Sequence, residues 1–447
     1  MPAKSFDLNL KTKIPPFNKS IEVDSDKSMS IRSFLIGSIS ENISSTKNVL
    51  ESDDVFSAIS CLKKLGVKII KKEKKSYLVY GKGLGSLFAA KNTKLNFGNS
   101  GTLARLLIGI LSTTPNIEVN LTGDSSLKKR DMRKLIDLMT KFGAFFLPKN
   151  KNKFPLKMIS SAIPLGLNYK AGVSAQLKSA VILAGLNAYG ITRVMEKEKS
   201  RDHTENMLIK NSKAFNLKKG KKNIINIHGK NTLSPINISI PGDPSSAAFF
   251  TALTLLNYKS KLRIKNVGLN KTRIGFYNLL KKTGNNILFK NLKKKNNEIR
   301  GDIIVKSCKL SPIKASKKYY VNSTDEYPIL FVMAALIKGT SIFKGIEDLS
   351  NKESNRIKEM QKILSQIGVK SAFKKNEMKI FGKGKIDASK KKIVVKNLGD
   401  HRICMSSFVL GLLTGAKTYI KNFETVYTSS PSFLKIMKSL GAKYETK

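Results

Sequence analysis

Asp26-Lys27-Ser28-Met29-Ser30 opens an apolar stretch near the start of the chain, and similar short phrases open apolar stretches at five later places. The later phrases are Asn99-Ser100-Gly101-Thr102, Val173-Ser174-Ala175-Gln176, Asp243-Pro244-Ser245-Ser246, Asp325-Glu326-Tyr327-Pro328 and Asp400-His401-Arg402. Neighbouring phrases begin 70 to 82 residues apart. Repetition at a nearly fixed spacing indicates that the chain consists of copies of one structural unit.

Each phrase places a capping or charged side chain at the start of a predicted helix. Unpaired backbone N–H groups and the helix macrodipole favour an anion at such a position. The helices that follow are apolar nearly all round, so we expect them to be buried on every side. They are predicted at residues 31–39, 103–111, 177–186, 247–256, 329–336 and 403–413. The six helix N-termini suggest one strongly anionic ligand site.

The remainder of each repeat contains a short strand, an amphipathic helix and two further strands, which gives a βαβαββ unit. Amphipathic helices are predicted at residues 54–65, 129–142, 272–283, 355–367 and 432–440. Each of these five helices is followed by a glycine suited to a left-handed C-cap, namely Gly66, Gly143, Gly284, Gly368 and Gly441. In the third repeat, Phe215-Asn216 is expected to take that place. The sixth repeat stops at Lys447, so we expect the segment before Asp26 to supply its closing strands.

The length of 447 residues favours two domains. We expect an α/β fold with three βαβαββ repeats in each domain. Residues 1–24 plus 241–447 are predicted to form a discontinuous domain with repeats 4–6, and residues 25–240 a domain with repeats 1–3. The active site is expected in the cleft between the domains, where helix N-termini from both sides face an anion.

The formal net charge of +51 raises the possibility of a nucleic-acid-binding protein. The lysines are spread along the whole chain, and runs such as Lys71-Lys72 and residues 293–295 fall in polar stretches between apolar segments. This distribution favours a solvated basic surface. We therefore expect no specific nucleic-acid partner.

Apolar runs are about half the length of a membrane span, and residues 1–13 have no continuous apolar segment typical of a secretory signal. Cys61, Cys308 and Cys404 are far apart, which predicts neither a disulfide framework nor a zinc site. We expect a cytoplasmic protein that does not bind membranes.

Lys352-Glu353-Ser354-Asn355-Arg356 is the sharpest local motif, because it combines two cations and a carboxylate at the start of a predicted helix. These side chains suit anion binding with proton transfer, although a surface ion-pair cluster would have the same composition. The other half of the chain offers a phosphate-binding set of hydroxyl groups and cations. That set comprises Lys27, Ser28, Arg32 and Lys128-Lys129-Arg130.

Together these motifs resemble the 5-enolpyruvylshikimate-3-phosphate synthase family, and the resemblance covers essentially the whole chain. It rests on residues 26–32, 99–105, 123–130, 174–176, 201–205, 325–328, 352–356 and 400–402. Ser174-Ala175-Gln176 and Arg201-Asp202-His203-Thr204-Glu205 are similar to the second bacterial class of the family. The resemblance implies two inside-out α/β domains of three βαβαββ units each. It also implies an addition–elimination between phosphoenolpyruvate and shikimate 3-phosphate, without metal or cofactor.

The resemblance also implies roles for individual residues. Asp325 would take the proton of the attacking hydroxyl, while Glu353 and Lys27 would serve the other proton transfers. The residues implied for shikimate 3-phosphate are Lys27, Ser28, Arg32, Ser174, Ala175, Gln176, Arg201, Asp325 and Lys352. Those implied for phosphoenolpyruvate, whose site glyphosate occupies in this family, are Lys27, Gly101, Arg130, Gln176, Arg356 and Arg402.

Two alternatives stay open. The sister enolpyruvyl transferase that acts on UDP-N-acetylglucosamine shares the fold but typically uses a loop cysteine, and residues 116–130 contain none. A basic nucleic-acid-binding protein would need surface aromatic residues between its charges, and the chain has no Trp. The two small substrates are the expected partners of a monomeric enzyme.

Overall fold

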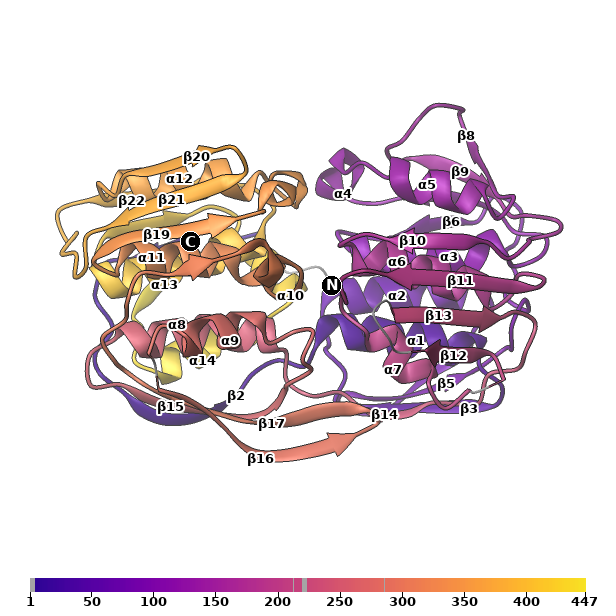
Figure 1. Ribbon diagram of the computed structural model, residues 1–447, viewed down its shortest axis with the longest axis horizontal. Coiled ribbons are helices and arrows are strands. Elements are labelled where there is room, and N and C mark those ends of the chain that lie inside the picture. The colour runs from indigo at the N-terminus through magenta and orange to yellow at the C-terminus, as the bar shows by residue number, and fades with distance from the viewer. Residues whose placement is uncertain (1–4, 212, 219–222, 285) are drawn as a thin grey trace. The chain divides into compact units, whose positions relative to one another are not determined.

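Six four-stranded sheets contain the named strands of the computed structural model, which describes residues 5–211, 213–218, 223–284 and 286–447 (Figure 1). The chain divides into two compact units, each with a hydrophobic core of its own. The first unit comprises Met1–Asp24 and Pro241–Lys447, and the second comprises Ser25–Ile240. The chain therefore begins in the first unit, completes the second, and then returns.

The second unit contains seven helices and twelve strands in its described part. The helices are α1 (Lys27–Ile39), α2 (Asp53–Lys64), α3 (Gly101–Ser112), α4 (Ser125–Lys129), α5 (Arg133–Thr140), α6 (Ala175–Gly185) and α7 (His203–Leu208). The strands are β3 (Ile43–Lys47), β4 (Ile69–Glu73), β5 (Ser76–Tyr80), β6 (Lys94–Asn96), β7 (Glu118–Thr122), β8 (Phe145–Leu147), β9 (Leu156–Ile159), β10 (Asn168–Ala171), β11 (Ile191–Glu196), β12 (Phe215–Lys218), β13 (Asn223–His228) and β14 (Asn237–Ser239).

The first unit is built from similar elements with four added 3-10 helices. Its α-helices are α8 (Pro244–Leu256), α9 (Gly275–Lys281), α10 (Tyr320–Ser323), α11 (Tyr327–Ala335), α12 (Arg356–Gln366), α13 (His401–Thr414) and α14 (Phe433–Ser439). The 3-10 helices are η1 (Lys317–Tyr319), η2 (Thr324–Glu326), η3 (Glu347–Asn351) and η4 (Phe423–Thr428). The strands are β1 (Leu8–Leu10), β2 (Asn18–Glu22), β15 (Lys261–Gly268), β16 (Ile287–Lys295), β17 (Glu298–Lys306), β18 (Lys314–Ala315), β19 (Gly339–Lys344), β20 (Ser371–Lys374), β21 (Glu377–Gly382), β22 (Lys392–Val395), β23 (Lys417–Ile420) and β24 (Tyr444–Thr446).

All six sheets have the same construction. In the sheet β6-β7-β9-β8, β6 runs parallel to β7, and the pairs β7–β9 and β9–β8 are antiparallel. Helix α3 connects the parallel pair, and α4 and α5 lie between β7 and β8 in the chain. This arrangement confirms the predicted βαβαββ unit.

Three repeats include a strand that comes from a distant part of the chain. In the sixth repeat, β1 pairs with both β23 and β24, so the N-terminal segment supplies one closing strand as expected. The other closing strand, β24, comes from the C-terminus itself, and its existence was not predicted. Strand β2 pairs with β15 in the fourth repeat, and β14 pairs with β3 in the first.

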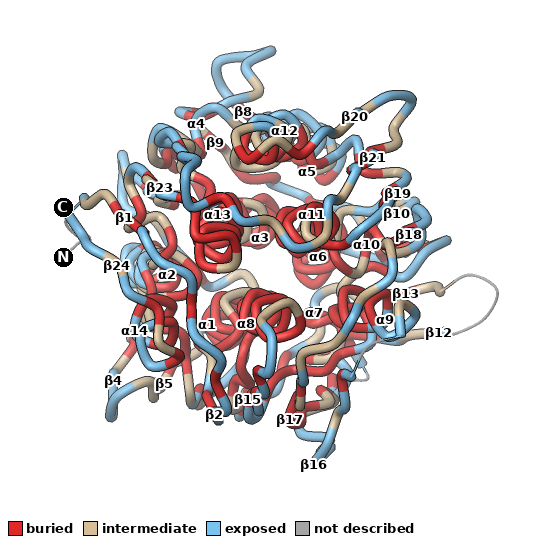
Figure 2. The backbone as a smooth tube through the Cα atoms, turned by 90° about the vertical axis from the view of Figure 1, so that its left-hand side faces the viewer, coloured by how far each residue is buried: buried red, intermediate tan, exposed pale blue. Residues whose placement is uncertain are grey.

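The first helix of each repeat is buried, as its apolar composition predicts. In the first unit, α8, α11 and α13 contact one another, and Phe249, Phe331 and Phe408 are fully buried. Figure 2 shows these helices in the colour of buried residues and the outlying loops as exposed. In the second unit, α3 packs against α1 and α6. A Cβ at Gly109 would lie 2.6 Å from Ala180 O, so only glycine permits this approach of α3 to α6.

The glycine C-caps are confirmed, since Gly66, Gly143, Gly284, Gly368 and Gly441 all have positive φ. The expected cap at Phe215-Asn216 is wrong, because α7 ends at Leu208 and Phe215 begins β12. The predicted helix 129–142 is interrupted between α4 and α5. Arg130 leaves α4 in an extended conformation, and Asp131 Oδ1 accepts a hydrogen bond from Arg133 N at 2.7 Å, which starts α5.

The lysines lie mainly at the surface. Lys71 and Lys72 in β4 and residues 293–295 in β16 are exposed on hairpin strands, as expected. Lys178 is the only lysine of the described residues that is buried. Within the same described residues, no helix has the length and apolar character that crossing a membrane requires.

Candidate active site

Helix α1 positions the first group of predicted residues. Asp26 caps this helix by accepting a hydrogen bond from Met29 N at 2.8 Å, which fixes Lys27 and Ser28 in the first turn. Arg32, one turn further on, is buried, and its Nη1 donates to Ser28 Oγ at 2.9 Å. Lys27 Nζ lies 2.9 Å from Oδ2 of the buried Asp54, so this ion pair fixes the ammonium group.

The start of α3 contacts two arginines and the first turn of α6. Arg105 Nη1 donates to Gly101 O at 3.1 Å and to Gln176 Oε1 at 3.0 Å. Arg130 Nη2 donates to Asn99 Oδ1 at 2.7 Å. A Cβ on Gly101 would lie 2.7 Å from Nη1 of both arginines. The predicted residues Gly101, Arg130 and Gln176 therefore lie in one basic cluster with Arg105.

Helix α6 supplies three predicted residues from its first turn. Ser174 is the N-cap, and its hydroxyl accepts a hydrogen bond from Leu177 N at 3.4 Å. Ala175 and Gln176 are the first two helical residues, and both are partly exposed. Arg201 lies between β11 and α7 and is also partly exposed.

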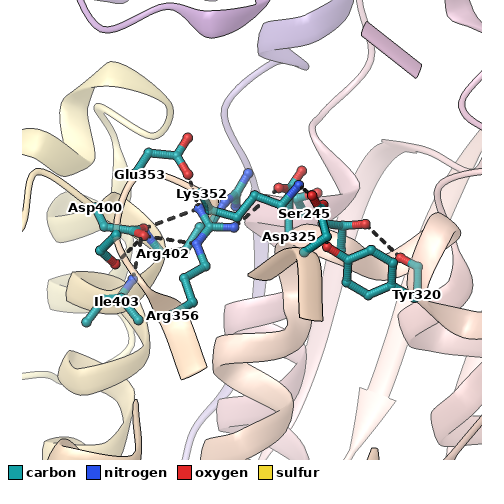
Figure 3. A network of polar contacts seen from close by, with 12 residues as sticks. Ser245, Tyr320, Asp325, Lys352, Glu353, Arg356, Asp400, Arg402 and Ile403 are labelled. Carbon is teal, nitrogen blue, oxygen red and sulfur yellow. Dashed lines mark hydrogen bonds and ion pairs between the residues drawn. The ribbon is translucent and has the colours of Figure 1, made fainter. Parts of the chain in front are cut away.

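In the first unit, Arg356 is the centre of the polar network in Figure 3. Its side chain is 1% exposed and contacts three carboxylates. Nε lies 2.9 Å from Asp400 Oδ2, Nη2 lies 2.6 Å from Glu353 Oε2, and Nη1 lies 3.7 Å from Asp325 Oδ1. Burial lowers the pKa of Arg356, but the three carboxylates outweigh this effect and raise it. Arg356 and Asp400 are therefore buried at the centre of the cluster, while Glu353 and Asp325 are 19% and 25% exposed, so the motif is more than a surface ion pair.

Asp400 joins the starts of two helices. Its Oδ1 accepts hydrogen bonds from Arg402 N at 3.0 Å and Ile403 N at 3.4 Å, so it caps α13. Its Oδ2 accepts from Arg356 Nε and from Ser354 Oγ, both at 2.9 Å. One carboxylate thus fixes the first turn of α13 and the guanidinium group at the start of α12.

Two buried guanidinium groups keep N–H groups available for a ligand. Arg402 Nε and Nη1 and Arg356 Nη1 have no hydrogen-bond partner among the described residues. The Arg402 guanidinium lies 5.8 Å from the centroid of the Phe249 ring. A buried donor without a partner costs about 1–3 kcal/mol, so these groups favour an oxygen anion.

Lys352 is partly exposed beside this network. Its Nζ lies 2.6 Å from Asp348 Oδ2, and Asp348 also accepts a hydrogen bond from Tyr320 OH at 2.8 Å. Burial, followed by the nearby Asp348 carboxylate, raises the pKa of the Tyr320 hydroxyl, which therefore stays protonated as a donor. Tyr320 and Asp348 together direct the Lys352 side chain.

Sequence analysis did not predict the long-range contacts of several residues that hold this site. Asp400 and Asp54 both lie at helix starts, where an acid has an ordinary explanation as a capping or dipole-compensating residue. Their contacts with Arg356 and Lys27 span 44 and 27 residues of sequence. Only the repeated helix-start phrase marked Asp400, and no signal marked Asp54.

The two units carry polar groups of different chemistry. The second unit offers hydroxyl groups and the cations Lys27, Arg32, Arg130 and Arg201, which suit phosphate or carboxylate. The first unit offers the guanidinium groups of Arg356 and Arg402 beside the carboxylates of Asp325 and Glu353. Carboxylates held next to cations can act as a general base and a general acid.

Comparison with known proteins assigns nearly the whole chain to the family that its sequence motifs resemble. A family model described as EPSP synthase (3-phosphoshikimate 1-carboxyvinyltransferase) matches residues 11–437. The 3-phosphoshikimate 1-carboxyvinyltransferase of Paramagnetospirillum magneticum is 36% identical over 434 residues, which are 96% of each chain. That of Petrotoga mobilis is 37% identical over 96% of this chain and 99% of its own.

Solved structures agree. An EPSP synthase from Acinetobacter baumannii superimposes with a TM-score of 0.84 at 32% identity, covering 99% of this chain and 100% of that one. The enolpyruvyl transferase NikO from Streptomyces tendae shares the fold, with a TM-score of 0.75 at 12% identity and 99% coverage of both chains. By its sequence and its fold, the chain belongs to the EPSP synthase (3-phosphoshikimate 1-carboxyvinyltransferase) family.

Proposed function

We propose that this protein transfers the enolpyruvyl group of phosphoenolpyruvate to the 5-hydroxyl of shikimate 3-phosphate, with release of inorganic phosphate. The reaction serves the synthesis of chorismate and aromatic amino acids. The observation that carries the proposal is the pair of buried guanidinium groups, Arg356 and Arg402, beside two carboxylates in a chain of this family. Such a pair supports binding of a substrate carboxylate next to groups that move protons.

The carboxylates of the first unit have separate roles in this proposal. Asp325 accepts the proton of the 5-hydroxyl as its oxygen attacks the second carbon of phosphoenolpyruvate. Glu353 delivers a proton to the methylene carbon, which becomes a methyl group in the tetrahedral intermediate. In the elimination, Glu353 takes a proton back from that methyl group, the bond between the second carbon and the bridging oxygen breaks, and Lys27 protonates this oxygen as inorganic phosphate leaves. Arg356 and Arg402 stabilise the substrate carboxylate through both steps.

Substrate binding draws on both units. Shikimate 3-phosphate is assigned to the hydroxyl, amide and basic groups that the first turns of α1 and α6 present. Those residues are Lys27, Ser28, Arg32, Ser174, Ala175, Gln176 and Arg201, with Asp325 and Lys352 from the first unit. Phosphoenolpyruvate is assigned to Lys27, Gly101, Arg130, Gln176, Arg356 and Arg402.

We also propose that the protein works as a monomer in the cytoplasm and binds no nucleic acid specifically. The three free cysteines support a reducing compartment. Light scattering tests the oligomeric state and should give the mass of one chain. A stable dimer would contradict this part of the proposal.

The acceptor substrate can be tested directly by mass spectrometry. The protein is incubated with phosphoenolpyruvate and either shikimate 3-phosphate or UDP-N-acetylglucosamine. We expect the carboxyvinyl group on shikimate 3-phosphate only. Transfer to UDP-N-acetylglucosamine instead would assign the protein to the sister activity.

A further inference from the structure

Lys178 differs from every other lysine of the described residues because it is buried, with a side chain that is 0% exposed. It lies in α6, and its Nζ contacts carboxylates on two other segments. Glu196 Oε1, at the end of β11, is 2.8 Å away, and Glu205 Oε1, in α7, is 2.5 Å away. Both glutamates are buried as well. The three residues form a buried charge network that joins α6, β11 and α7.

A buried ion pair needs an explanation other than stability. Taking charges out of water costs several kcal/mol per ion, and apolar side chains of similar volume often stabilise a protein equally well. A network of this kind can instead fix the relative positions of the segments that carry its members. The neighbours of Lys178 and Glu205 indicate which group depends on those positions.

The residues next to the network in sequence hold the guanidinium group of Arg32. Ser179 follows Lys178, and its Oγ accepts a hydrogen bond from Arg32 Nη2 at 3.2 Å. Thr204 precedes Glu205, and its Oγ1 accepts from Arg32 Nε at 2.9 Å. Thr204 Oγ1 also donates to Ser179 Oγ at 2.8 Å. The ion pair between Lys178 and Glu205 therefore connects α6 to α7. The hydroxyl pair of Ser179 and Thr204 connects the same two helices at the adjacent sequence positions.

The network also fixes the segment before Arg201. Glu196 Oε1 accepts hydrogen bonds from Ser200 N at 3.1 Å and from Ser200 Oγ at 3.0 Å. Ser200 is buried and directly precedes Arg201. Helix α7 has only six residues and begins directly after this segment, at His203.

We infer that Lys178, with Glu196 and Glu205, is a positioning residue for shikimate 3-phosphate. The network holds α6, α7 and the Ser200–Arg201 segment at fixed separations, so that Arg32 and Arg201 are presented to the ligand in one geometry. Lys178 itself acts only through these groups and does not contact the ligand. This inference rests on the proposed function, because it concerns binding of the acceptor substrate.

The charge state of Lys178 agrees with this role. Burial lowers its pKa, but Glu205 and Glu196 outweigh that effect and raise it, so the ammonium group is charged at neutral pH. Burial raises the pKa of Glu205, and the ammonium group of Lys178 opposes this change. Removal of Lys178 alone would leave Glu205 buried without a cation, so the variant needs a second substitution.

The test is the double variant Lys178→Met/Glu205→Gln, in which Glu196 keeps its hydrogen bonds from Ser200. We expect the Michaelis constant for shikimate 3-phosphate, and its dissociation constant by calorimetry, to rise at least about tenfold. The turnover number at saturation and the Michaelis constant for phosphoenolpyruvate should stay within about threefold. Lys157→Met is the matched control, because Lys157 pairs with Glu118 on the exposed surface of the same unit. It should change none of these quantities.

A second pair of variants tests the positioning role if Lys178→Met/Glu205→Gln does not fold. Thr204→Val removes the hydroxyl that joins Arg32 to α7, and Thr204→Ser keeps it. The first should weaken shikimate 3-phosphate binding selectively, while the second should bind it as the wild type does. Unchanged binding in a folded Lys178→Met/Glu205→Gln or in Thr204→Val would overturn the inference, as would an equal change in all kinetic constants. Failure of the wild type to bind shikimate 3-phosphate would instead refute the proposed function.

Discussion

Asp400 Oδ2 lies 2.9 Å from Arg356 Nε, and both side chains are at most 1% exposed. The same carboxylate caps α13 through the backbone N–H groups of Arg402 and Ile403. The start of α13 and the position of the Arg356 guanidinium group therefore depend on a single side chain. Any change at Asp400 should affect stability and substrate binding together.

The first prediction concerns this shared role. Asp400→Ala should lower the free energy of unfolding by about 3–5 kcal/mol, because it leaves the buried Arg356 charge without its most deeply buried partner. Asn355→Ala is the matched control, since Asn355 caps α12 by accepting from Lys358 N at 3.1 Å but pairs with no buried charge. Its loss should cost only about 1 kcal/mol. Urea unfolding of both variants measures the difference, and equal losses would show that Asp400 acts as a cap alone.

The second prediction concerns the two carboxylates assigned to proton transfer. Asp325→Asn and Glu353→Gln should fold normally and each lose turnover by more than about 100-fold, in the usual range for a general acid or base. Glu359→Gln is the control, because Glu359 lies on the same helix as Arg356 but pairs with the exposed Lys362. Steady-state kinetics of the three variants measure the turnover number of each. Near-normal turnover in either variant would remove that residue from the mechanism.

The third prediction concerns Gly101 and glyphosate, which resemblance to the family places in the phosphoenolpyruvate site. A Cβ on Gly101 would lie 2.7 Å from Nη1 of Arg105 and of Arg130, so both guanidinium groups must shift in Gly101→Ala. Both atoms are the far ends of flexible side chains, so they can move at little cost to the fold, and the added methyl group then acts mainly on the ligand. We expect the wild type to be inhibited by glyphosate, and Gly101→Ala to weaken glyphosate more than phosphoenolpyruvate, because the inhibitor is longer. An equal rise in the inhibition constant and the Michaelis constant would exclude Gly101 as the steric discriminator.

The fourth prediction is a pH dependence of stability at Asp302 in β17. Burial raises the pKa of its carboxyl group, but hydrogen bonds from Asn266 N, Arg263 and Asn291 outweigh burial and lower it. A depressed carboxyl pKa contributes stability above the unfolded value, about 3.9, and the contribution is lost as the pH falls through the folded value. Asp302→Asn should therefore be less stable than the wild type at pH 7, and the gap should close below about pH 4.

Thermal unfolding across this pH range provides the measurement for Asp302. Glu118→Gln is a suitable control because its ion pair with Lys157 is exposed and contributes little. A stability gap between wild type and Asp302→Asn that stays constant down to pH 3 would refute the linkage. A gap that widens in acid would contradict its sign.

Much of the fold could be predicted from the sequence because its signals are local. The helix-start phrases and the all-round apolar helices recur in every repeat, and a C-cap glycine follows the amphipathic helix in five of the six. Exchanged strands such as β1 depend on pairing across hundreds of residues, which the sequence indicated only through an incomplete final repeat. The break between α4 and α5 was not predicted, because the sequence keeps its helical periodicity there. The backbone of Arg130 is extended, and its side chain donates a hydrogen bond to Asn99.

The candidate site was predictable to a similar extent. Arg32 was predicted as part of a phosphate-binding set and Arg356 as part of the motif at residues 352–356, and the structure shows both buried in polar networks. Their supporting partners could not be found in the same way. Asp400 and Thr204 lie within the motifs, but their contacts with Arg356 and Arg32 could not be predicted, and no pattern marked Lys178.

The most direct test of the proposed activity is release of inorganic phosphate from phosphoenolpyruvate by the purified wild-type protein. The account predicts rapid release when shikimate 3-phosphate is also present, one phosphate for each acceptor consumed, and none when either substrate is omitted. Asp325→Asn, prepared in the same way, should release phosphate more than about 100-fold more slowly. Release from phosphoenolpyruvate without shikimate 3-phosphate, or no release with both substrates, would contradict the account.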